Sequence, residues 1–341
     1  MRYIGSKTAL RSDIRAIVES IAPRSNVFCD LFAGTGAVGR EFKSSHRLIC
    51  NDIMFFSYVL NRAHNGLKHS PEFRKLSKNL NTDPINHLNS IRADPNEVTE
   101  DDFMTISFSP AGDARRQYLS VENALRIDKI RKLIGAWRAE ELIDDNGFHY
   151  LLAALIEAVP SVSNTTGTYG AYLKHWDQRA LKPLLVEPLE IEETTFDNEV
   201  FNADANTLIR SLRGDVLYLD TPYNGRQYSS NYHLLETLAR YDEPVLKGIT
   251  GTRTDRAGAS VYCRKNLVYE AFEDLLSRAN FGALVISYSS DGLLTRDQVS
   301  DLLLKQGKKE SLKIREIHHR RYKRVANDQR HVTEYLMGIN R

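Results

Sequence analysis

The chain has 341 residues, of which 42% are hydrophobic and 26% charged, and its formal net charge is +2. This composition is typical of a globular protein, and the length predicts one large domain with room for a second, smaller one. No stretch approaches the ~18 uninterrupted apolar residues of a membrane span, and the N-terminus lacks the apolar run of a secretory signal. We therefore expect a cytoplasmic protein with no membrane partner.

The three cysteines, Cys29, Cys50 and Cys263, are odd in number and widely spaced. No Cys/His spacing resembles a zinc site, so we expect neither a bound metal nor a disulfide framework. With so small a net charge, any nucleic-acid surface must be local rather than global. Two basic segments, 247–265 and 311–331, are candidates for such a surface, although basic runs are more often solvated faces.

The first sixty residues follow the order of an α/β fold. A helix is expected at about 8–21, and an apolar strand at 26–32 breaks into the glycine-rich turn 33–39. A short helix follows, and then a second strand at 47–52, which ends on Asp52. Strand, glycine turn, helix, strand and acid form the opening of a doubly wound α/β domain.

The pattern changes between residues 62 and 199. The segment 68–110 is polar and is expected to be a loop, whereas 118–140 and 148–159 have helical patterns. A turn-rich loop is expected at 161–170. We interpret 62–199 as an inserted domain.

Strand patterns return after the insertion. Apolar strands are expected at 215–219 and 283–287, and an antiparallel hairpin is expected at about 312–339. The α/β domain is therefore expected to consist of residues 1–61 and 200–341.

Gly34, Gly36 and Gly39 form a G-x-G-x-x-G turn, with Asp52 at the end of the next strand. This pattern fits a dinucleotide, whose pyrophosphate would face the helix and whose ribose would bind the acid. It fits equally well the methionine part of S-adenosylmethionine, with Asp52 on the ribose hydroxyls. Both ligands need glycines that allow close approach of the backbone, and a purely structural turn is a third interpretation.

The tetrapeptide Asp220-Thr221-Pro222-Tyr223 directly follows a predicted strand, which places it at the ligand-binding edge of such a sheet. An exocyclic amine is a poor nucleophile because its lone pair is delocalised into the ring. The Asp220 carboxylate and a carbonyl near Pro222 would accept the two amine hydrogens, while the Tyr223 ring would stack on an extruded base. The alternative is an ordinary turn at the end of a strand.

Together, residues 30–36 and 220–223 resemble the Dam-like (class alpha) group of DNA adenine methyltransferases, whose pattern is F-x-G-x-G followed by D-P-P-Y. The resemblance implies a Rossmann-like class I S-adenosylmethionine-dependent methyltransferase fold, with 62–199 as the inserted DNA-recognition domain and a C-terminal antiparallel hairpin. It further implies methyl transfer from S-adenosylmethionine to N6 of a flipped adenine in double-stranded DNA. Thr221 departs from the family pattern, which usually has Pro at that position.

The resemblance also assigns site residues. The catalytic residues are Asp220, Pro222 and Tyr223. The cofactor-binding residues are Tyr3, Lys7, Asp30, Phe32, Gly34, Gly36, Asp52, Asp204 and Asp220. The residues expected to bind DNA are Asn164, Tyr169, Arg226, Arg321 and Arg324. The loop 163–170 is similar to the family's R-x-N-x-x-G-x-[FY] loop but has Val162 in place of its Arg. Lys7 as a solvated lysine and Asp204 as a turn cap remain as structural alternatives.

Other functions stay open at this point. The same residues fit N4-cytosine or RNA methylation. A nicotinamide-dependent oxidoreductase would use the glycine turn but would leave 220–223 unexplained, and a silent DNA-binding module is a further alternative. Within the resemblance, we expect a monomer that forms the modification half of a restriction–modification system, with a separate cognate endonuclease.

Overall fold

The computed structural model describes residues 5, 7–255, 258–320 and 331–341. Three predicted site residues, Tyr3, Arg321 and Arg324, lie outside these ranges. The chain divides into two compact units, and we describe each by itself. The sheet unit consists of Lys7–Ile53, Thr194–Gln227 and Ala259–Arg341, and the helical unit consists of Met1–Ser6, Met54–Glu193 and Tyr228–Gly258.

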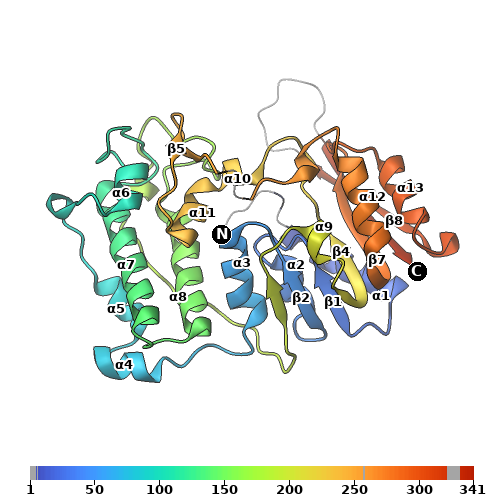
Figure 1. Cartoon of the computed structure of the whole chain (residues 1–341), viewed down its shortest axis with the longest axis horizontal. Helices are drawn as coiled ribbons and strands as arrows, with labels where there is room; N and C mark the ends of the chain where they lie inside the picture. The colour runs from blue at the N-terminus through green and yellow to red at the C-terminus, as the bar shows by residue number, and fades with distance from the viewer. Residues whose placement is uncertain (1–4, 6, 256–257, 321–330) are drawn as a thin grey trace. The chain divides into compact units, whose positions relative to one another are not determined.

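A seven-stranded sheet in the order β3-β2-β1-β4-β7-β9-β8 forms the centre of the sheet unit (Figure 1). The first five strands in this order run parallel, whereas β9 runs antiparallel to β7 and β8 antiparallel to β9. The strands are β1 (Val27–Asp30), β2 (Arg47–Asn51), β3 (Glu199–Phe201), β4 (Arg213–Leu219), β7 (Asn280–Ser289), β8 (Lys313–Arg320) and β9 (His331–Asn340). The predicted α/β class and the predicted C-terminal hairpin are both confirmed.

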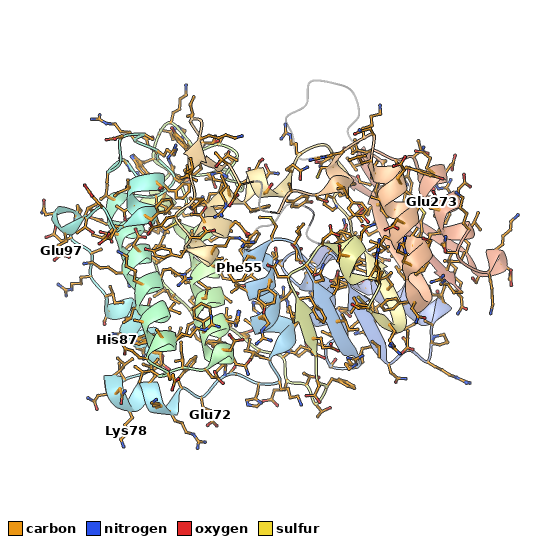
Figure 2. The ribbon with its side chains drawn as sticks, in the orientation of Figure 1. Phe55, Glu72, Lys78, His87, Glu97 and Glu273 are labelled. Carbon is orange, nitrogen blue, oxygen red and sulfur yellow. The ribbon has the colours of Figure 1, made fainter. Side chains whose placement is uncertain are left out.

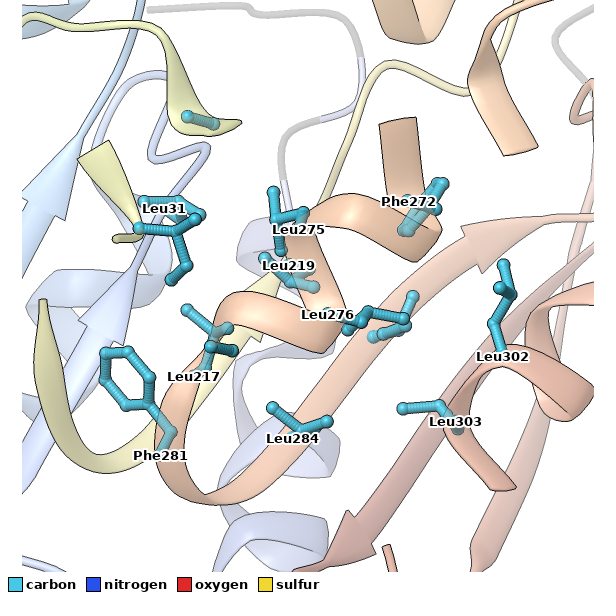
Figure 3. Packing of buried hydrophobic residues seen from close by; sticks show 14 of the residues in the cluster. Leu31, Leu217, Leu219, Phe272, Leu275, Leu276, Phe281, Leu284, Leu302 and Leu303 are labelled. Carbon is cyan, nitrogen blue, oxygen red and sulfur yellow. The ribbon is translucent and has the colours of Figure 1, made fainter. Parts of the chain in front are cut away.

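Helices cover both faces of this sheet because its central strands are buried on both sides. Alternate strand residues divide between two cores: Phe28 and Tyr218 pack towards α1 and α2, whereas Leu217 and Leu284 pack towards α12 and α13 (Figure 3). The helices of this unit are η1 (Lys7–Leu10), α1 (Arg11–Ile21), α2 (Ala37–Phe42), α9 (Ala205–Leu208), η6 (Val261–Cys263), α12 (Val268–Arg278), α13 (Arg296–Leu304) and η7 (Lys309–Ser311). All three cysteines are buried, and none of them forms a disulfide within the described residues.

The helical unit is built around α7 (Val121–Ala139) and α8 (Asp145–Ala158), which pack against each other (Figure 1). These two helices confirm the predictions for 118–140 and 148–159. The other helices are α3 (Phe55–Asn61), η2 (Arg62–Gly66), α4 (Arg74–Leu80), α5 (Pro84–Ser90), η3 (Pro95–Glu97), α6 (Phe103–Phe108), η4 (Val159–Val162), η5 (Gln178–Leu181), α10 (Tyr228–Asn231) and α11 (His233–Arg240). A small antiparallel hairpin, β5 (Leu246–Lys247) and β6 (Thr252–Arg253), completes the unit.

The expectation of a loop at 68–110 is wrong, because α4, α5 and α6 lie within it. These helices have only six or seven residues, too few to show a clear periodicity, and non-local contacts stabilise them. The buried carboxylate of Asp128, on α7, accepts the N–H groups of Met104 and Thr105 at the start of α6. On α5, the ring of His87, which is labelled in Figure 2, packs against Trp137 of α7, with ring centroids 5.9 Å apart.

The boundaries of the helical unit differ from the predicted insertion at 62–199. The unit also includes α3 and residues 228–258. The reason is a set of contacts among α3, α8 and α11. The buried carboxylate of Glu236, on α11, accepts the N–H groups of Phe55 and Phe56 at the start of α3, both at 3.0 Å. In the described part of the chain, no helix is both long and apolar enough to cross a membrane.

Candidate active site

Four aspartates stand at one edge of the sheet in the sheet unit. Asp30 ends β1, and Asp52, Asp204 and Asp220 follow β2, β3 and β4. Because these four strands are parallel neighbours, their carboxyl ends meet at the same edge, which is where open α/β sheets bind ligands. Asp52 and Asp220 were expected here from the strand patterns that precede them, whereas Asp30 and Asp204 were assigned by the resemblance to the family.

The glycine turn between β1 and α2 lies at this edge. Gly34 and Gly36 have φ values of 52° and 77°, a region that residues with a Cβ rarely adopt. The N–H of Gly34 donates to Asp52 Oδ2 over 2.8 Å. The predicted ribose acid and the glycine turn are therefore in direct contact.

Asp30 is buried at this edge, with 1% of its surface exposed. Burial, together with the nearby carboxylates of Asp220 and Asp52, raises its pKa well above the usual range, although the N–H groups of Phe32 and Gly39 oppose this. Among the described residues, its Oδ1 has no hydrogen-bond partner. A buried carboxylate oxygen left without a donor is costly, and it fits a ligand that brings a cationic donor.

Lys7, in η1, is almost fully buried rather than solvated. Its Nζ lies 3.1 Å from Asp220 Oδ1 and 2.7 Å from Glu334 Oε1. Glu334, on β9, also accepts a hydrogen bond from Ser287 Oγ on β7 over 2.7 Å. One ammonium group is therefore shared by two carboxylates. Glu334 was missed in the sequence, where the only signal was a single acid within an apolar terminal strand.

These surroundings change the protonation of Asp220. Burial raises its pKa, the charge of Lys7 lowers it, and that of Glu334 raises it, with a net result of about 7. The pKa of Lys7 is raised above its usual value because the carboxylates of Asp220 and Glu334 outweigh the effect of its burial. Lys7 is therefore a fixed cation, and Asp220 titrates near neutrality.

The remainder of the tetrapeptide is half-buried or buried. The ring centroid of Tyr223 lies 5.5 Å from Lys7 Nζ and 6.2 Å from the ring of Tyr288. The Tyr223 carbonyl accepts the N–H of Leu293 over 2.7 Å, which fixes the backbone after Pro222. Thr221 is 1% exposed, and its hydroxyl has no partner within the described residues. The Tyr223 ring is thus held beside the Lys7–Asp220 pair.

Two further predicted cofactor residues have visible structural roles. Asp204 is exposed, and its Oδ1 caps α9 by accepting the N–H of Thr207 over 2.9 Å. The half-buried ring of Phe32 contacts the ring of Tyr262 edge-on, with centroids 5.1 Å apart. The cap agrees with the structural alternative for Asp204, and binding of a cofactor by either residue remains a prediction.

The sequence matches the family of D12 class N6 adenine-specific DNA methyltransferases over residues 3–291. The chain belongs to this family. The match confirms the resemblance inferred from the motifs at 30–36 and 220–223, and it removes the reason to interpret the glycine turn as part of an oxidoreductase.

Curated relatives agree with this assignment. The chain is 43% identical over 343 residues to the Type II methyltransferase M.FokI of Planomicrobium okeanokoites, an alignment that covers 100% of this chain and 53% of that protein. It is 38% identical over 343 residues to the modification methylase StsI of Streptococcus sanguinis, covering 100% and 52%. It is also 38% identical over 335 residues to the Type II methyltransferase M.NlaIII of Neisseria lactamica, covering 97% and 95%. The chain therefore spans about half the length of the first two relatives and nearly all of the third.

The geometry does not support the DNA contacts assigned to Asn164 and Tyr169 by resemblance to the family loop. Asn164 is fully buried; its amide donates to the carbonyls of Leu173 and His175 and accepts the N–H of Asp177. Tyr169 is 3% exposed, and its hydroxyl contacts Ser163. These hydrogen bonds hold the loop together. They also leave no polar group of the Asn164 side chain free to contact a base.

Some of the basic residues in the candidate DNA-binding segments are buried and others are exposed. Arg253 is 6% exposed and forms ion pairs with Asp242 and Asp255, so it is not available to a phosphate. Arg226 is exposed, and its binding to DNA stays a prediction. The exposed cations within 247–265 include Lys247, Arg264 and Lys265. The sequence alone could not distinguish the buried, paired Arg253 from these exposed cations, because both count equally as basic residues.

Proposed function

We propose that this protein transfers a methyl group from S-adenosylmethionine to N6 of adenine in duplex DNA, as the modification enzyme of a restriction–modification system. One observation carries the proposal: Asp220, at the carboxyl edge of the sheet, is paired with the buried Lys7 and lies beside the ring of Tyr223. The printed names of the relatives, Type II methyltransferases and modification methylases, support the biological setting.

The acidic edge fits S-adenosylmethionine, which has a cationic sulfonium, a cationic ammonium and a ribose diol. The unpaired Oδ1 of Asp30 suits the ammonium group, and the glycine turn allows close approach of a ligand. Asp52, which accepts the N–H of Gly34 in the glycine turn, would accept hydrogen bonds from the ribose. When bound, this cofactor supplies an electrophilic methyl group.

The chain's own residues prepare the amine. Lys7 favours the ionised form of Asp220, which accepts one N6 hydrogen and draws off positive charge as the nitrogen becomes tetrahedral. A main-chain carbonyl near Pro222 accepts the other hydrogen, and the ring of Tyr223 stacks on the extruded adenine. The carboxylate acts mainly in the transition state, because the positive charge on nitrogen builds only as the methyl group is transferred.

The helical unit, which contains most of residues 62–199, is proposed to recognise DNA. Exposed Arg226 and the exposed cations of 247–265 would contact phosphates, and the protein would act as a monomer beside a separate endonuclease. Because such contacts release counterions, DNA affinity should fall steeply as salt is raised.

The deciding experiment is incubation of the purified protein with genomic DNA and S-adenosylmethionine, followed by sequencing of modified bases and nucleoside mass spectrometry. N6-methyladenine at one short sequence, formed by wild type and not by Asp220→Ala, is expected. Formation of N4-methylcytosine instead would refute the assignment to adenine, and an unmodified product would refute the function.

A further inference from the structure

The hairpin formed by residues 245–253 exposes apolar side chains that nothing in the site described above uses. Ile249 at its tip is 80% exposed and Val245 is 73% exposed. The strands pair antiparallel, Leu246 with Arg253 and Lys247 with Thr252. In the described part of the chain, the other exposed large hydrophobic residues are less exposed, Leu181 at 48% and Leu185 at 56%. An apolar side chain held at the end of a hairpin points to a partner.

Buried side chains of the same unit hold the backbone of the tip. Arg116, 8% exposed, donates to the carbonyls of Ile249 over 3.0 Å and Gly248 over 3.1 Å. The hydroxyl of Tyr118 donates to the carbonyl of Thr250 over 3.1 Å, and a ring nitrogen of His233 lies 2.8 Å from the same oxygen. Three buried side chains therefore fix the carbonyls of residues 248–250. The tip is rigid at the one point where its side chain is exposed.

The base of the hairpin is fixed as well. Buried Arg253 pairs with Asp242 on one side of the hairpin and with Asp255 on the other. Gly248 and Gly251 adopt φ values of 69° and 68°, which lets the chain turn tightly around Ile249. A hairpin held at both ends is already ordered, so its tip loses little conformational entropy when it binds a partner.

The chemistry of the tip fits duplex DNA. Residues 245–251 include the exposed Lys247 and no acidic residue, so the tip is complementary to a polyanion. Extrusion of a base leaves a gap between two flat, apolar base faces, and proteins fill such gaps with Ile, Leu, Phe, Met or Pro wedges. We propose that the 245–253 hairpin is a wedge, with Ile249 inserted into the base stack that the adenine leaves and Lys247 against a neighbouring phosphate. This inference rests on the proposed methylation of duplex DNA.

The test compares Ile249→Ala with a matched control, Leu185→Ala, which shortens an exposed leucine of the same unit. Duplexes contain the target sequence, found by sequencing of modified bases, with 2-aminopurine or adenine at the methylated position. For Ile249→Ala we expect a smaller rise in 2-aminopurine fluorescence and a single-turnover methylation rate at least about tenfold lower. Cofactor affinity is expected to be unchanged. Ile249→Leu and Leu185→Ala should behave as wild type.

A second substrate separates a wedge from a general defect. Opposite an abasic site the adenine has lost its pairing partner and extrusion is easier, so Ile249→Ala should recover most of its rate there. Equal fluorescence and rates for Ile249→Ala and wild type on the intact duplex would overturn the wedge alone. So would a change of oligomeric state in sedimentation with extrusion intact, since the tip would then be a contact between copies. A wild-type protein that methylates no duplex would overturn the proposed function, and the wedge with it.

Discussion

Lys7 Nζ lies 3.1 Å from Asp220 Oδ1 and 2.7 Å from Glu334 Oε1, so one buried cation bridges the strand end that carries the tetrapeptide and the C-terminal strand β9. An ion pair this well buried is costly to break, because removal of one partner leaves the other charge buried and uncompensated. The cost of burying the charges offsets much of their attraction, so the pair adds little net stability, and its clearer effect is that Lys7 lowers the pKa of Asp220. This relationship leads to the first two predictions.

Asp220→Ala should lower kcat by ~10²-fold or more, equivalent to about 3 kcal/mol of transition-state stabilisation. Cofactor binding should remain largely intact, because the carboxylate acts as charge develops on the amine. Single-turnover methylation of the target duplex measures the first effect, and calorimetry with S-adenosylmethionine measures the second. Asp301→Ala, which changes an exposed acid on α13, is the control. Transfer by Asp220→Ala at nearly the wild-type rate would show that the proposed mechanism is wrong.

The pH dependence of methylation should depend on Lys7. In wild type, Asp220 ionises near its pKa of about 7, so the rate should rise as the pH increases through that value. Lys7→Met removes the cation that favours the carboxylate. The pH at which the rate rises should therefore increase by about one to three pH units. Single-turnover rates from about pH 5 to about pH 10, which cover the wild-type value and the expected shift, provide the test.

Two variants make the Lys7 test specific. Lys7→Arg keeps the charge, so its methylation rate should rise at nearly the same pH as that of wild type. A merely structural role for Lys7 would instead lower the rate of Lys7→Met at all pH values, without shifting the pH at which it rises. Lys308→Met changes a lysine outside this cluster and should leave the profile unchanged. An unshifted profile in Lys7→Met would disconnect Lys7 from the charge of Asp220.

Asp52 and Asp220 were predictable because each follows an apolar strand pattern, and parallel strands bring their carboxyl ends together whatever the rest of the fold does. Asp204 was assigned only by the resemblance to the family, since β3, which precedes it, has just three residues and gave no strand pattern. Glu334 was not predictable. Its carboxylate reaches Lys7 only because β9 pairs antiparallel with β7, and no local pattern encodes that pairing. The opposite error arose for Arg253 and Asn164, whose residue types suit DNA but whose polar groups are paired inside the protein. Residue type predicts chemistry, whereas burial decides whether a partner can reach it.

Asp52→Ala should weaken binding of S-adenosylmethionine by ~1.5–3 kcal/mol, the scale of a lost hydrogen bond to a charged group. Because Asp52 also accepts the N–H of Gly34, the alanine variant loosens the glycine turn as well. Asp52→Asn keeps an oxygen for that N–H and removes the charge, so it separates the two effects. Calorimetry should place its affinity between those of wild type and Asp52→Ala. Unchanged affinity in both variants would remove Asp52 from the site.

Tyr223→Ala should impair capture of the extruded adenine, because a stacking surface worth ~1–3 kcal/mol is lost. Tyr223→Phe keeps the ring and should retain much of the activity, since stacking needs no hydroxyl. Single-turnover rates at several DNA concentrations distinguish weaker capture from slower transfer. Equal loss in the alanine and phenylalanine variants would assign the role to the hydroxyl rather than to the ring.

Asp30→Asn should make the protein more stable and less able to bind its cofactor. Burial first, and then the charges of Asp220 and Asp52, raise the pKa of Asp30 in the folded chain, so the folded state holds this proton more tightly than the unfolded state. The contribution of Asp30 to stability is therefore fully present below its unfolded pKa and is lost as pH rises towards the folded value. Asparagine cannot ionise, so the variant should lose this decline, and its Tm at neutral pH should exceed that of wild type by a few degrees, roughly 2–4 °C per kcal/mol regained.

The unpaired Oδ1 of Asp30 is also the proposed partner of the cofactor's ammonium group, so Asp30→Asn should bind S-adenosylmethionine more weakly. Thermal unfolding over a series of pH values from acidic to neutral, with and without cofactor, measures both effects. Asp301→Asn, on the exposed face of α13, should change neither. A variant with lower Tm at neutral pH and undiminished cofactor affinity would mean that Asp30 holds the fold and not the ligand.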